Sequence, residues 1–343
     1  MILVKSFLLK FKWGYRRWFV HHPQSRKIRK IYGLSNADIL PKNEKYFLSI
    51  VAIFKGEDSY LLEWIEFHRL MGVEHFFLYD NGEELSSAEL LEPYKQSGIV
   101  THIPFPHRKG LKDKDNKIDT LTIQQLAYGD CLLRFRTHLQ YLIQLDIDEF
   151  IFPASKKVDN IVSLLKNLKE KNTKGIEINW TLFGNNGHKS KPPGLVLANY
   201  TRTANDLAAI KLVNVKSIGN VNYISKKYQF SNVHRFIYRF SVKDIINRIL
   251  TGNPNVIRGD AASQLFQINH YKIKSREEFL NKKNIYSDGW LDDRDYRGLF
   301  DNFNNQLNQA DNFNILRFVP DLKSRLVKLQ DTSSKPYLPQ LDV

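Results

Sequence analysis

The feature that most constrains this chain is a hydrophobic run that ends abruptly in acidic residues. Residues 141–145 lead directly into Asp146, Asp148 and Glu149, and hydrophobic residues resume at 150–152. A buried strand rarely tolerates carboxylates, and alternation along an extended chain would aim Asp146 and Asp148 at one side of a sheet. Two acids that close repel each other, and magnesium or manganese bridging to a substrate phosphate removes the repulsion. The alternative is a strand end whose acids simply point into water.

Length and cysteine content narrow the class of protein. With 343 residues the chain can bury a substantial core without disulfides or structural metals. Its single cysteine, Cys131, cannot form an internal bridge, which favours a reducing compartment. The ten histidines form no Cys/His cluster with zinc spacing. The chain also lacks the glycine-rich phosphate loop and the dinucleotide fingerprint, so a phosphate would have to be held in another way.

The positive charge is concentrated at the N-terminus. Residues 1–37 hold nine Lys or Arg and no Asp or Glu, which leaves about +6 of the net +15 for the rest of the chain. At a helical period, hydrophobic residues between Leu3 and Phe19 fall on one side, but no run approaches the ~20 residues that span a bilayer. This composition favours a helix lying in an anionic membrane surface through residues 1–20. The alternative is a helix packed on the body of the same protein.

Strands and helices alternate after residue 45, which predicts an α/β fold with a mainly parallel sheet. Each early strand ends in a polar turn, and in such sheets ligands bind beyond the carboxyl ends of the strands. We therefore expect one crevice lined by Lys55 and Glu57, by Asp80 and by the acidic run. We predict three regions: a basic amphipathic segment 1–44, a catalytic domain 45–285 and a C-terminal helical extension 286–343. The expected strands are 47–54, 75–79, 99–103, 141–145 and 175–180, and the expected helices include 60–71, 87–95, 120–136 and 158–171.

An ordered set of short motifs resembles glycosyltransferase family 92 and the related bacterial glycosyltransferases of the family 2 type. The resemblance spans roughly residues 46–285 and lies in the segments 52–57, 62–68, 72–76, 79–81, 124–128, 145–150, 180–188, 234–236 and 269–271, together with Lys211. It implies a GT-A fold, which is a Rossmann-like sandwich that binds a nucleotide-sugar, with a D-x-D motif holding Mn or Mg against the diphosphate. It also implies inversion at the anomeric carbon. The lysine-proline segment of the family is not clear here, so acceptor specificity does not carry over.

The resemblance also suggests roles for individual residues. Asp146 and Asp148 match the D-x-D motif as metal and diphosphate ligands, and His234 is the expected late metal or phosphate ligand, with His270 as its competitor. Lys55, Glu57, Asp80, Lys117 and Asp146 form the expected nucleotide-sugar site, although Glu57 and Asp80 are equally compatible with helix capping and a tight turn. Glu177 leads Asp206 and Asp288 as the general base of an inverting reaction.

Together these features predict a metal-dependent hexosyltransferase that uses a nucleotide-sugar, with a UDP-sugar as the expected donor, and a polysaccharide or lipopolysaccharide acceptor. We expect it on the cytoplasmic face of a bacterial inner membrane. Two other classes stay open. A basic nucleic-acid-binding protein is compatible with the high pI, although no nucleic-acid motif is present. A non-catalytic membrane scaffold is the other.

Overall fold

The central sheet is built from the buried strands that the sequence predicts. The computed structural model describes residues 45–82, 87–106, 122–206, 214–226, 232–252, 254–286 and 293–332, so the N-terminal segment, Lys117 and Asp288 lie outside the described residues. The strands are β1 (Tyr46–Phe54), β2 (His75–Asp80), β3 (Val100–Pro104), β4 (Leu139–Gln144), β5 (Glu149–Pro153), β6 (Gly175–Leu182), β7 (Arg202–Thr203), β8 (Val215–Asn220), β9 (Val256–Ile257), β10 (Phe266–His270) and β11 (Ala310–Asp311).

Nine of these strands form one mixed sheet in the order β3-β2-β1-β4-β8-β6-β10-β5, with β9 beside β6. The pairs among β3, β2, β1 and β4 are parallel, as are β6 with β10 and with β9. Strand β8 runs antiparallel to both neighbours, and β5 runs antiparallel to β10. This mixed, mainly parallel sheet confirms the predicted fold class.

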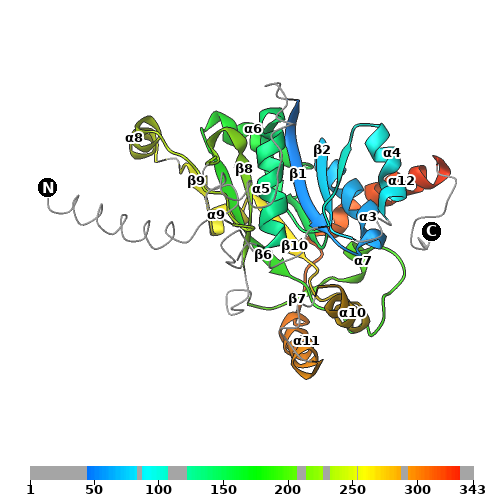
Figure 1. The fold of residues 1–343 in the computed structure, drawn as a ribbon. Helices are drawn as coiled ribbons and strands as arrows, with labels where there is room; N and C mark the ends of the chain where they lie inside the picture. The colour runs from blue at the N-terminus through cyan, green and yellow to red at the C-terminus, as the bar shows by residue number, and fades with distance from the viewer. Residues whose placement is uncertain are drawn as a thin grey trace, which may run out of the picture.

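Helices cover both faces of the sheet (Figure 1). They are α3 (Asp58–Leu70), α4 (Ser87–Gln96), α5 (Ile123–Phe135), α6 (Ile161–Glu170), α7 (Val196–Asn199), α8 (Val242–Thr251), α9 (Asp260–Ser263), α10 (Arg276–Tyr286), α11 (Asp293–Leu307) and α12 (Val319–Thr332), with short 3₁₀ turns η1 (Arg136–His138), η2 (Val221–Tyr223) and η3 (Asn314–Phe318). In the part of the chain that the structure describes, no helix is long and apolar enough to cross a membrane.

Because side chains alternate between the two faces of β1, this strand contributes residues to two separate hydrophobic cores. Leu48, Ile50 and Ala52 join the larger core, which also contains side chains of α3, α4, α6 and α12. Val51 points to the opposite face and joins the smaller core under α5. The larger core extends to Leu322 and Leu326, so residues of the predicted C-terminal extension pack with the sheet domain.

The acidic run is a turn rather than a continuation of the strand. Strand β4 ends at Gln144 and β5 starts at Glu149, and the amide of Glu149 donates to the carbonyl of Asp146 at 3.1 Å. The alternation argument for Asp146 and Asp148 is therefore wrong, because neither residue belongs to a strand. Strands β4 and β5 lie four places apart in the sheet order, and residues 145–148 reverse the chain between them at the carboxyl end of β4.

Candidate functional site

Helix α3 fixes the position of this turn, which we call the acidic turn (residues 145–149). The indole nitrogen of Trp64 donates to the carbonyl of Asp146 at 3.1 Å and to the carbonyl of Glu149 at 2.9 Å. One fully buried side chain therefore holds both ends of the turn. Buried backbone carbonyls need such donors, since leaving them unpaired is costly.

His68 lies one helical turn after Trp64 on α3 and supports the strand that follows the acidic turn. Its Nδ1 lies 2.8 Å from the carbonyl of Trp64, and its Nε2 accepts from the amide of Ile151 at 3.3 Å. Burial lowers the pKa of His68 to about 3, so the ring is neutral and can accept this bond. His68 is thus a structural support for β5.

The side chain of Asp146 is held by three residues from two elements. Its Oδ1 accepts from Gln124 at 2.5 Å and from the Tyr128 hydroxyl at 3.0 Å, both on α5. Its Oδ2 lies 2.9 Å from Nζ of Lys216 on β8. The side chain is still 31% exposed, so it can reach a ligand as well as its protein partners.

The side chain of Asp148 contacts a different set of residues. Its Oδ2 accepts from Nζ of Lys282 on α10 at 2.6 Å, and its Oδ1 lies 3.3 Å from Nε2 of His270. Burial acts to raise the pKa of Asp148, but Lys282 and His270 outweigh it and hold this pKa well below its usual value. Asp148 is therefore a carboxylate at neutral pH. The structure brings His270, the competitor in the sequence prediction, to Asp148.

Glu149 follows the two aspartates in the acidic turn and is fully buried. It interacts electrostatically with both of them. Its Oε2 accepts from the amide of Asp146 at 2.8 Å and lies 3.4 Å from Nζ of Lys216, and its Oε1 is 3.9 Å from Nδ1 of His270. Burial, followed by the charge of Asp146, raises the pKa of Glu149 well above its usual value. A neutral Glu149 limits the negative charge that the turn must carry.

Further lysines surround the turn, and the sequence prediction did not include them. Burial followed by the nearby Lys282 lowers the pKa of Lys274 to about 8, and burial also lowers the pKa of Lys272. Both lysines are close enough to Asp148 for its charge to oppose these shifts. A signal was available in the alternation of Lys272 and Lys274 directly after His270.

Trp180 on β6 forms an aromatic wall beside the acidic turn. Its ring centroid lies 4.5 Å from that of His270 and 5.3 Å from that of His234, and both contacts are edge-on. Burial, and then the charge of Lys216, lower the pKa of His234 to about 4. His234 is therefore near the site as a neutral ring, and His270 is the histidine in contact with Asp148.

Glu177, the predicted base, is engaged in two ion pairs. Its Oε2 accepts from Arg235 at 3.0 Å and its Oε1 accepts from Arg258 at 2.7 Å, and the residue is buried. Both oxygens are therefore occupied by guanidinium groups. The alternative Asp206 is exposed at the end of a described segment, and Asp288 lies outside the described residues.

The remaining predicted residues lie at neighbouring strand ends. Phe54 of β1 pairs with Asp80 of β2, so Lys55 and Glu57 follow β1 at the edge where Asp80 ends β2. Asp80 accepts from the amide of Gly82 at 2.8 Å, from Ser87 at 2.5 Å and from His102 at 3.1 Å. Burial opposes ionisation of Asp80, but these hydrogen bonds, that of His102 first, lower its pKa.

The donor atoms of the acidic turn determine whether a divalent cation fits. Among the residues that the structure describes, no three Asp, Glu, His or Cys side chains converge as a ligand set. Magnesium, however, is usually held by one or two carboxylates, with water and substrate phosphates completing its shell. Asp148 with the adjacent His270 supplies such a small set, and Lys282 would compete for the same carboxylate. The residues fit a cation that arrives together with a diphosphate.

Comparison with known proteins was made on the sequence and on the fold. The model of glycosyltransferase family 92 matches residues 45–218. A family 92 protein of Oryza sativa subsp. japonica is 25% identical over 258 residues, which are 73% of this chain and 38% of that protein. A family 92 protein of Arabidopsis thaliana is 23% identical over 273 residues, which are 76% of this chain and 41% of that protein. The chain thus spans well under half the length of these curated relatives.

Two solved structures share a low overall similarity with this chain. The crystal structure of S. aureus TarS 1-349 in complex with UDP covers 75% of this chain and 70% of its own, with a TM-score of 0.35 and 10% identity. LgtC, a galactosyltransferase solved with donor and acceptor sugar analogues, covers 76% of this chain and 97% of its own, with a TM-score of 0.29 and 11% identity.

Proposed function

Because the chain belongs to glycosyltransferase family 92, we propose that it is a glycosyltransferase of the GT-A class that transfers a hexose from a UDP-sugar to a polysaccharide or lipopolysaccharide acceptor, with inversion. The proposal depends chiefly on the acidic turn. Two aspartates, one of them buried as a carboxylate, lie at the carboxyl end of a parallel strand among buried lysines. That edge is where nucleotides bind in open α/β sheets.

The charges around the turn suit a diphosphate. Asp148 would hold a divalent cation, and Asp146 would face the cation or the ribose of the donor. A bound cation would neutralise charge that develops on the leaving nucleoside diphosphate. Lys216, Lys272 and Lys282 all lie near the acidic turn, since each interacts electrostatically with Asp146 or Asp148. They would orient the phosphates once the cation has replaced Lys282 at Asp148.

Trp180 is only 8% exposed and belongs to the larger core, so it would support the site by packing against the two histidines rather than by stacking on a sugar ring. Its edge-on contacts with His234 and His270 keep the indole fixed beside the turn. An inverting reaction also needs a base for the acceptor hydroxyl. Glu177 would fill that role only if a donor or acceptor displaced one of its two arginines.

The test is release of UDP from a panel of UDP-sugars, with manganese, with magnesium and with EDTA. Asp148→Asn should abolish turnover and manganese binding measured by calorimetry, while thermal unfolding stays cooperative. The control is Asp301→Asn, which changes an exposed residue on α11. Full turnover by Asp148→Asn, or turnover that EDTA leaves unchanged, would contradict the proposed role of the acidic turn.

The same assay tests whether Lys282 competes with the cation. Lys282→Gln should bind manganese more tightly than the natural protein, since the ammonium group lies 2.6 Å from Asp148. Weaker manganese binding by this variant would mean that Lys282 supports the site rather than occupying it.

We also propose that the enzyme lies on the cytoplasmic face of the membrane through its basic segment 1–37. Removing that segment should reduce binding to anionic liposomes. Unchanged binding would rule out this role of the segment.

A further inference from the structure

Helix α8 presents an uncovered apolar face. Val242, Ile245, Ile246, Ile249 and Leu250 recur at the spacing of one helical face, and they are 72%, 52%, 50%, 75% and 78% exposed. Soluble surfaces rarely gather large aliphatic side chains in this way, so such a patch marks an interaction site. In Figure 1, α8 projects from the body of the protein, away from α12.

The helix is well formed despite this exposure. Ser241 and Asp244 form a reciprocal capping box at its start, and Gly252 ends it in the left-handed conformation at φ 70°. Asp244 also forms an ion pair with the buried Lys174. These contacts fix the polar side of α8 to the body and leave the apolar side facing outward.

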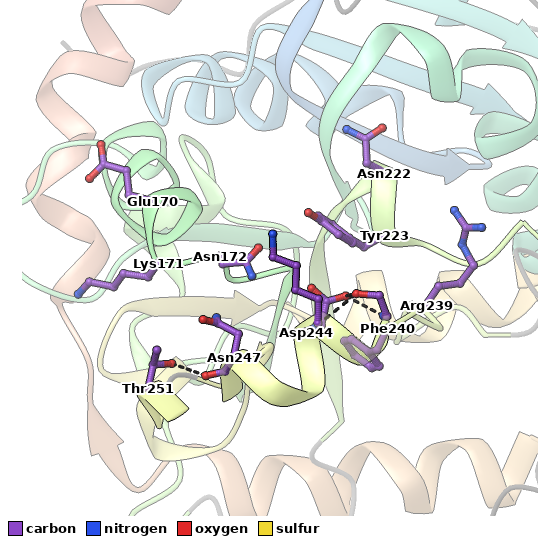
Figure 2. Close-up of a pocket in the computed structure, with 12 residues that line it drawn as sticks. Glu170, Lys171, Asn172, Asn222, Tyr223, Arg239, Phe240, Asp244, Asn247 and Thr251 are labelled. Atoms are coloured by element: carbon purple, nitrogen blue, oxygen red, sulfur yellow. Dashed lines mark hydrogen bonds between the residues drawn. The ribbon is translucent and has the colours of Figure 1, made fainter. Parts of the chain in front are cut away.

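The polar side of α8 borders a cleft of about 970 Å³ (Figure 2). None of the five apolar residues lines this cleft, so the two sides of the helix have different environments. The lining is mixed: it contains Lys171, Arg239 and Lys243, the acidic Glu170 and Asp244, two aromatic residues and several neutral polar residues. Arg248 adds an exposed positive charge on the helix itself.

Lys45, where the described residues begin, is connected to the cleft beside α8 through two short turns. The amide of Lys45 donates to the carbonyl of His138 in η1, and Arg136 of η1 donates to the carbonyl of Val221 in η2. Tyr223 of η2 lines the cleft beside α8. Residues 1–37, with nine basic and no acidic residues, precede Lys45 in the sequence.

We propose that the apolar face of α8 inserts into the surface of an anionic phospholipid bilayer. The aliphatic stripe would enter the boundary between headgroups and acyl chains, and the flanking lysines and arginines would pair with lipid phosphates. This contact is separate from the transfer reaction and from the basic segment 1–37, and it supplies the second of the two signals that stable peripheral binding requires.

The test uses the full chain and vesicles of phosphatidylcholine with or without phosphatidylglycerol. Changing Ile249 and Leu250 together to Gln should weaken binding to the anionic vesicles at least about tenfold, because two exposed aliphatic side chains no longer enter the bilayer. The matched control is Val327→Gln, which changes a 41% exposed residue on α12 and should leave binding unchanged. Binding by the double variant within about twofold of the natural protein overturns the proposal.

A second measurement identifies what covers the face. A polarity-sensitive fluorophore on Leu250→Cys labels that position alone, since the natural Cys131 is fully buried. The emission should shift to the blue when anionic vesicles are added. Three results overturn the proposal: no shift with vesicles, a shift without vesicles that grows with protein concentration and so reports a second copy, or a shift without vesicles that disappears when residues 1–37 are removed.

Discussion

Glu63 provides a quantitative test of how buried charge shapes this fold. Its carboxylate on α3 accepts from the amide of Val196 at 2.9 Å and from the amide of Leu197 at 3.0 Å, and so caps the start of α7. Burial outweighs these two bonds and raises the pKa of Glu63 from 4.5 to about 7. The folded protein therefore binds this proton more tightly than the unfolded chain does.

The sign of the pH dependence follows directly. Below pH 4.5 the carboxyl is protonated in both states, and between pH 4.5 and about 7 only the folded protein keeps the proton. The stabilisation that the raised pKa provides is therefore lost as the pH rises through about 7. Integrated between pH 5 and pH 8, Glu63 alone should lower the free energy of unfolding by about 2–3 kcal/mol.

Glu63→Gln removes this titration while keeping a side-chain oxygen that can accept. Urea unfolding followed by tryptophan fluorescence at pH 5, 6, 7 and 8 gives the free energy of unfolding of both proteins. The variant should gain about 2–3 kcal/mol relative to the natural protein across that range. Glu170→Gln, an exposed carboxylate on α6, is the control and should change stability by less than about 0.5 kcal/mol. Parallel pH profiles for Glu63→Gln and the natural protein would refute the reasoning.

Three further predictions concern buried polar and packed positions. Lys216→Met should lower the free energy of unfolding by about 1–3 kcal/mol at pH 7, because the partly exposed Asp146 loses the buried ammonium group that pairs with it, and an unchanged urea midpoint would contradict this. The lowered pKa of Asp80 provides stability that the natural protein loses as the pH falls through that pKa. Asp80→Asn should lack this contribution, since His102 no longer faces a carboxylate. Acid unfolding that is identical in both proteins would argue against it. Gly175→Ala should lower the melting temperature by an amount equivalent to about 1–3 kcal/mol, because the added Cβ would lie 1.9 Å from the hydroxyl oxygen of Tyr238, and equal melting temperatures would exclude the clash.

Local patterns in the sequence were sufficient for much of the fold. The expected strands 47–54, 75–79 and 175–180 correspond to β1, β2 and β6, and the expected helix 120–136 corresponds to α5, which a capping box at Thr122 starts at Ile123. These elements follow from hydrophobic periodicity and turn residues, which are local properties. The antiparallel insertion of β8 between β4 and β6 was not predicted, because pairing between strands distant in sequence leaves no local signal.

The candidate site was predictable only in part for the same reason. The two aspartates stood out because carboxylates interrupt a hydrophobic run. Their partners Lys216 and Lys282 lie 70 and 134 residues after Asp146 and Asp148 in the sequence, and only the tertiary structure brings them together. The ion pairs of Glu177 with Arg235 and Arg258 were invisible in the same way.

Because Trp64 of α3 holds the acidic turn by hydrogen bonds, the position of the site depends on the C-terminal residues that pack on α3. Helix α12 and the preceding turn η3 pack on α3, with Phe318 of η3 against Phe67 and Arg325 of α12 3.5 Å from Glu66. A truncation that spares every residue of the family match would still strip the outer support from the helix that sets the two aspartates. Loss of activity in such a shortened protein would mean that α3 no longer holds the acidic turn in place. It would not mean that a reactive group has been removed.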